Sequence, residues 1–245
     1  MVQYEEIGKR VGIGWGLLAT SARVFIEYNV FWLYAALMFA LWYGMHTFLT
    51  SYPLGALMLG ILIKTIVGAF IVHQASTLPG GTRPSWQASL YVCYQRILLL
   101  FGWAAIEILF WHLSNLTIAP GYGIAHELMV TAFNTLTLPV LPLIVDKNHE
   151  LAYIMHQTWS ITQKNWIEAA SGILPLTIIT TSVYRWIMYS HGAYRTWPIN
   201  LLVYGTLYLL LAAIVIIAAI FKAIVYRYSD RNRLIELSEF QSPYF

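Results

Sequence analysis

Apolar positions in this chain gather into six long runs, separated by short polar connections that are rich in turn residues. A helix that crosses a bilayer needs about 20 mostly apolar residues, and each run meets that length. The chain is therefore predicted to be an all-α, polytopic membrane helix bundle that forms one domain over residues 1–245. The predicted spans cover residues 30–48, 54–72, 97–116, 124–145, 166–188 and 198–225.

Three shorter amphipathic segments precede the first, third and fifth runs. Residues 4–28 place apolar side chains at spacings of three and four, with charged residues on the opposite face, and residues 86–97 and 149–164 follow a similar pattern. Helices of this kind can lie in the plane of the membrane interface. The first segment also carries glycines at every fourth position, namely Gly8, Gly12 and Gly16. These glycines indicate either a flexible start or a helix that packs closely against another.

The order of amphipathic segment, span, short turn and span occurs three times along the chain. Trp15, Trp86 and Trp159 stand in corresponding segments, about 72 residues apart. The pattern favours an internal threefold repeat, although any six-span protein built of hairpins would also look periodic.

Composition supports a lipid environment. The chain is 59% hydrophobic and 10% charged, whereas soluble domains are about 25% charged. The net charge of +3 is small, and the basic residues are scattered at span ends, which excludes a nucleic-acid role. The lipid bilayer is the expected partner, together with a second copy of the chain or another membrane protein.

The distribution of lysine and arginine predicts an orientation, because cytoplasmic loops carry an excess of these residues. With the N-terminus inside, the inner segments hold eleven of them and the outer loops two, Arg185 and Arg195. Both termini and all three amphipathic segments are therefore predicted to be cytoplasmic. The inner set is Lys9, Arg10, Arg23, Arg83, Arg96, Lys147, Lys164, Lys222, Arg227, Arg231 and Arg233.

Lys64 is the most costly residue in the predicted spans, since a lysine at a helix centre costs about 2.5–3.5 kcal/mol on insertion scales. Glu107, in the third run, is an acid at comparable depth. We predict an ion pair between them. It is either a site that couples protons or substrate, or a clip that fixes helix packing, and we favour the clip.

A polar stripe follows one face of the fourth run. Its members are Glu127, Thr131, Asn134 and Thr135. Such stripes face a bundle interior or a wet cavity, so these residues either line a substrate path or form hydrogen bonds between helices. Prolines are expected to kink the fourth and fifth runs at Pro139, Pro142 and Pro175.

Motifs for catalysis are not apparent in the sequence. His149-Glu150 misses the zinc-protease pattern because Tyr153 stands where its second histidine would be, and we find no nucleophile elbow or phosphate-binding glycine loop. Isolated histidines near span ends (His46, His112, His126) lack ligand spacing. No catalytic residue, metal site or cofactor is therefore predicted. The chain is interpreted as a non-enzymatic membrane-organising or partner-binding component, with a small-solute or ion transporter or channel through spans 2–5 as the alternative.

The chain also resembles an uncharacterised family of six-span prokaryotic integral membrane proteins, similar in layout to the membrane domain attached to some glycerophosphodiester phosphodiesterases. The resemblance rests on Gly14-Trp15-Gly16-Leu17 before a basic helix, on Leu138-Pro139-Val140-Leu141 closed by Asp146, and on Ser160 with Lys164 to Trp166. Asp146 stands where glutamate is commoner. The resemblance implies this fold and a prokaryotic plasma (inner) membrane, and no established activity.

Overall fold

The computed structural model describes residues 2–48, 53–78, 85–117, 123–146, 150–189 and 197–241, and within these ranges the chain is an all-α helical bundle without strands. The helices are α1 (Val2–Glu27), α2 (Asn29–Phe48), α3 (Pro53–Thr77), α4 (Trp86–Gln95), α5 (Ile97–Thr117), α6 (Gly123–Leu136), α7 (Val140–Asp146), α8 (Leu151–Tyr189) and α9 (Trp197–Gln241).

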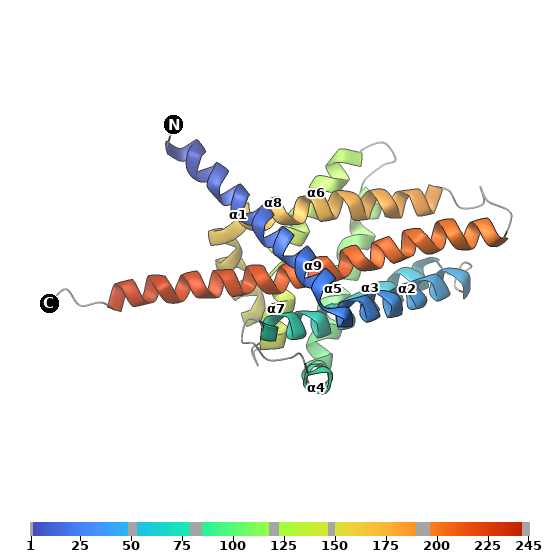
Figure 1. Cartoon of the computed structure of the whole chain (residues 1–245), viewed down its shortest axis with the longest axis horizontal. Coiled ribbons are helices and arrows are strands. Elements are labelled where there is room, and N and C mark those ends of the chain that lie inside the picture. The colour runs from blue at the N-terminus through green and yellow to red at the C-terminus, as the bar shows by residue number, and fades with distance from the viewer. Residues whose placement is uncertain are drawn as a thin grey trace.

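Helix α9 is the longest element and packs against α1, α2, α3 and α8. In Figure 1, α2, α3 and the second part of α8 run alongside α9, and α5 and α6 cross this direction. Helix α1 passes over α8 and α9, and the N and C marks lie at the same end of the molecule. The bundle is therefore organised around one helix that most of the others contact.

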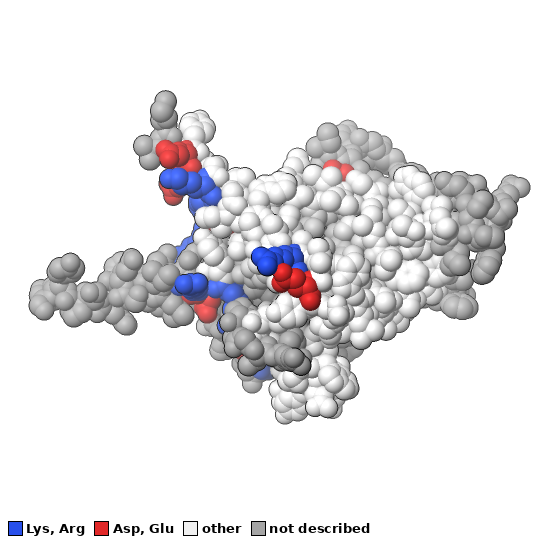
Figure 2. Space-filling view, in the orientation of Figure 1, with Lys and Arg blue, Asp and Glu red and all other residues white. Residues whose placement is uncertain are grey.

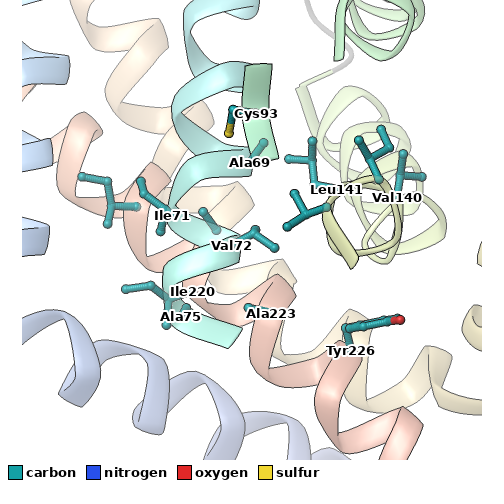
Figure 3. Close-up of a cluster of buried hydrophobic side chains, with 14 of the residues drawn as sticks. Ala69, Ile71, Val72, Ala75, Cys93, Val140, Leu141, Ile220, Ala223 and Tyr226 are labelled. Carbon is teal, nitrogen blue, oxygen red and sulfur yellow. The ribbon is translucent and has the colours of Figure 1, made fainter. Parts of the chain in front are cut away.

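The core lies where α3, α7 and α9 meet, as the close-up in Figure 3 shows. Ile71 and Val72 of α3, Val140 of α7, and Ile220 and Ala223 of α9 are all buried. Apolar residues occur all round these helices, because a helix buried on several sides has no polar face to keep.

Five helices are long and apolar enough to cross a membrane, and the pair α1 and α2, bent by 88° between them, passes the same test together. These helices fit a multi-pass membrane protein. The first predicted span, residues 30–48, corresponds to α2, so six spans result if that pair supplies one.

The fourth predicted span, residues 124–145, is not one helix. It breaks between α6 and α7 at Thr137, Leu138 and Pro139. Proline lacks an N–H group and its ring clashes with the carbonyl four residues earlier, which ends the helix here. Thr162 of α8 donates a hydrogen bond to the exposed carbonyl oxygen of Leu136 at 3.2 Å, so the break is compensated from outside. The kink expected near Pro139 is thus present.

Two other expectations need correction. The third amphipathic segment and the fifth span form the single helix α8, whose non-helical residue is Asn165 (φ −120°, ψ 23°), while Pro175 lies inside the helix. Helix α9 does not end near residue 225 but continues to Gln241, since the lysine, arginine and glutamate beyond the apolar run are good helix formers.

Candidate functional site

The predicted contact between Lys64 and Glu107 is formed. Lys64 Nζ of α3 lies 2.9 Å from Glu107 Oε2 of α5, and Thr65 Oγ1 donates a hydrogen bond to the same oxygen at 3.3 Å. The Glu107 side chain is 3% exposed and that of Lys64 is 28% exposed. The acid is therefore the buried centre of the cluster, and two consecutive residues of α3 hold it.

A second lysine belongs to this cluster, and the sequence did not indicate it. Lys222 of α9 is partly buried and interacts electrostatically with both Glu107 and Lys64. We had counted Lys222 only among the cytoplasmic charges. It is nevertheless the one charged residue inside the sixth predicted span, residues 198–225, and that position could have drawn attention to it. The site thus joins α3, α5 and α9.

The polar stripe of α6 faces α8 rather than this cluster. Asn134 Nδ2 lies 3.5 Å from Thr177 Oγ1 of α8, and Thr135 Oγ1 donates to the carbonyl oxygen of Thr131 in its own helix. Glu127 is half-buried about two turns before Asn134 on the same helix. These contacts favour the interpretation of the stripe as hydrogen bonding between helices.

A second ion pair, which sequence reasoning missed, fixes α1 on α8. Arg10 Nε lies 2.7 Å from Glu168 Oε1 and Arg10 Nη2 lies 2.7 Å from Glu168 Oε2, and Arg10 also donates to the Lys164 carbonyl oxygen. Glu168 is 4% exposed. The hydrogen bond to Glu168 raises the pKa of Arg10 above its usual value. A bidentate pair of this kind fixes orientation as well as position.

Glycines bring α1, α8 and α9 to one crossing point. A Cβ atom on Gly14 of α1 would overlap Ser171 Oγ and the Glu168 carbonyl oxygen, and one on Gly172 of α8 would overlap the Phe221 ring of α9. The same atom on Gly172 would lie 3.0 Å from the Gly14 carbonyl oxygen. The glycine ladder predicted for close packing is not used in this way, because Gly8, Gly12 and Gly16 have open space at their Cβ positions. The close packing belongs to Gly14, outside that ladder.

Polar contacts also tie the ends of α3, α4, α7 and α9. Tyr226 donates a hydrogen bond to Asp146 Oδ2 at 2.9 Å, and His73 Nδ1 lies 2.8 Å from Ser89 Oγ. Since Ser89 donates its own hydrogen to the Ser85 carbonyl oxygen at 3.0 Å, His73 must be the donor in this contact. A histidine that donates to serine cannot take its proton, so the pair links helices and is not a nucleophile with its base.

The described residues offer little room for a ligand at this end. An indentation of about 210 Å³ lies beside the Asp146–Tyr226 contact. Its lining consists of Val72, Ser76, Pro142, Val145, Asp146, Ala223, Tyr226 and Arg227. Within the described ranges no three His, Cys, Asp or Glu side chains group together as metal ligands would.

No family model, curated protein or solved structure matches the chain. The resemblance to the six-span prokaryotic family therefore stays a prediction, and any function must be argued from the geometry above.

Proposed function

We propose that this protein is a non-enzymatic, multi-pass component of a prokaryotic plasma membrane that organises lipid in the cytoplasmic leaflet. The observation that carries the proposal is that each of three amphipathic helical segments turns away from the span that follows it and exposes a tryptophan. Spanning helices supply the anchor, and the three segments supply the contact with the interface.

The backbone breaks at each of these junctions. Helix α1 meets α2 at 88°, which lays it across the direction of the span. Helix α4 ends at Arg96, whose backbone (φ −102°, ψ 10°) departs from helical geometry before α5 begins, and α8 kinks at Asn165. A helix set at a right angle to its span lies along the membrane surface, as an interfacial helix does.

The tryptophans on these segments are turned outward. Trp15 is 53% exposed, Trp86 58% and Trp159 55%. Tryptophan is enriched at the membrane interface because its ring is apolar while its N–H group remains hydrated. Three such side chains on three breaks from the bundle support insertion into one leaflet.

The proposal places both termini and the three segments in the cytoplasm. Lysine and arginine support this orientation, and in Figure 2 the charged residues on the visible face gather towards the end that holds the N- and C-terminal helices. Fusions of a reporter to each terminus test it: both should be active inside the cell, and activity of either outside would contradict the orientation.

The lipid role is tested on protein reconstituted into vesicles that carry an order-sensitive fluorescent probe. Wild type should raise lipid order, and the triple variant Trp15→Ser, Trp86→Ser, Trp159→Ser should lose most of this effect. A matched control replaces exposed tryptophans on the spans, at Trp32 and Trp186, and should retain it. Equal lipid order with wild type and the triple variant would reject the proposal.

A small-solute or ion transporter is the second candidate, and the charged cluster of Lys64, Glu107 and Lys222 favours it. Lys64→Met separates the two functions. If the pair is a clip, any activity should fall only as the folded fraction falls. If the pair couples transport, uptake into vesicles should be lost while the protein remains folded.

A further inference from the structure

Charge in the membrane-embedded cluster does not balance. Lys64 and Lys222 bring two ammonium groups and Glu107 brings one carboxylate. The carboxylate forms its ion pair with Lys64, and among the described residues Lys222 forms no ion pair. A lysine shielded from water needs a counter-charge, because its desolvation is costly.

Charged groups on the other helices that pack against α9 do not supply the missing negative charge. Glu168 of α8 is bound by Arg10 of α1, and Glu27 of α1 is bound by Arg23. Asp146 of α7 accepts the hydrogen bond from Tyr226. In the described part of α2, no aspartate or glutamate is present. The electrostatic partners of Lys222 are thus Glu107 and Lys64 alone.

The open side of the cluster presents donors. Glu107 is buried, and its Oε2 atom is covered by Lys64 and by Thr65, whereas both lysines retain partial exposure. A group that approaches from outside therefore meets N–H donors of two lysines before it meets the acid. Lysine ammonium groups bind phosphate as point charges with three donors each.

The cytoplasmic end of the bundle is the nearer approach to this site. The indentation beside Asp146 brings Val72 and Ser76 of α3 level with Ala223 and Arg227 of α9. Lys222 precedes Arg227 by five residues, which is about 7.5 Å along the helix. Lys222 therefore lies between the charged inner end and the deeper pair of Lys64 and Glu107.

We propose that Lys222 and Lys64 bind a phosphate group on the open side of this cluster, with Glu107 as the fixed counter-charge that holds Lys64 in place. The phosphate is either free inorganic phosphate or the headgroup of an anionic lipid. This binding site is independent of the lipid-ordering role of the three tryptophans.

Thermal unfolding of the detergent-purified full chain tests the site. Sodium phosphate is titrated at pH 7 and constant ionic strength, and the melting temperature of wild type should rise to a plateau. Lys222→Met should weaken apparent phosphate affinity at least about tenfold, since one of two ammonium groups is lost. Lys9→Met, which removes an exposed lysine paired with Glu5 on α1, should leave the affinity unchanged.

Two further arms keep the outcome decisive. Lys222→Arg preserves the charge and should bind phosphate within about threefold of wild type, which separates binding from a folding defect in Lys222→Met. In nanodiscs, stabilisation by phosphatidic acid or phosphatidylglycerol over phosphatidylcholine, lost in Lys222→Met, would assign the site to a lipid headgroup. The proposal is overturned if neither phosphate nor anionic lipid stabilises wild type, or if Lys222→Met responds as wild type does.

Discussion

Replacing Glu107 by glutamine should destabilise the folded protein more than replacing its partner Lys64 by methionine. Glu107→Gln leaves two lysines near each other without an acid, and an uncompensated buried charge costs about 3–5 kcal/mol. After Lys64→Met, Glu107 keeps the hydrogen bond from Thr65 at 3.3 Å and the attraction of Lys222. That change should therefore cost less, about 1–3 kcal/mol.

The combined variants sharpen this expectation. The double variant Lys64→Met, Glu107→Gln still leaves Lys222 without a counter-charge, but it removes the repulsion between the lysines, so it should be more stable than Glu107→Gln alone. Adding Lys222→Met removes every charge of the cluster and should return stability to within about 2 kcal/mol of wild type, because apolar replacements of buried ion pairs are often neutral or stabilising. The three substitutions couple because the side chains interact.

Reversible unfolding of the purified protein in mixed SDS and detergent micelles, followed by tryptophan fluorescence, measures these differences. If Lys64→Met costs as much as Glu107→Gln, Lys222 does not act on the acid. If the triple variant is as unstable as Glu107→Gln, the loss comes from packing and the electrostatic reasoning fails.

Two further changes test other parts of the structure. Gly14→Ala should lower stability by about 1–3 kcal/mol, because the new methyl group meets the backbone of α8, whereas Gly12→Ala has open space and should be neutral or stabilising by up to about 1 kcal/mol; equal melting temperatures would contradict the crossing. Burial raises the pKa of the Cys93 thiol to about 11 from the model-peptide 9.0, so at pH 8 its thiolate fraction should be about a hundredfold lower than that of a free thiol. Folded protein should react with iodoacetamide at least that much more slowly than unfolded protein. A cysteine at the exposed position 91, in a Cys93→Ala background, should react quickly, and fast labelling of native Cys93 would refute its burial. The unfolded thiol loses its proton first, so this burial should also reduce stability as pH rises from about 9 towards 11.

The contact between Lys64 and Glu107 could be predicted because two rare charges lay at matching depths in neighbouring antiparallel spans, and few other partners were open to either. Lys222 escaped the same reasoning because it comes from a helix far along the chain, and depth along one helix does not fix its rotation towards another. The span bounds followed from apolar run length, which is why the first three matched helices.

The pairing of Arg10 with Glu168 could not be predicted, since it joins residues 158 positions apart. It depends on the direction that α1 takes after the 88° bend, and no periodicity in the sequence encodes that angle. The glycines failed as a guide for a related reason. A ladder such as Gly8, Gly12 and Gly16 marks a face without bulk, but whether another helix covers that face is decided by the bend.

Helix α9 is 45 residues long and so extends about 67 Å, compared with about 40–45 Å for a whole bilayer with its headgroups. About 20 Å of it therefore projects as a rigid lever into the aqueous phase. A tilt of about 10° of this lever displaces its tip by about 3.5 Å, and the same rotation turns the segment around Lys222 against α3 and α5. Whatever grips the projecting end thereby acts mechanically on the charged cluster inside the membrane.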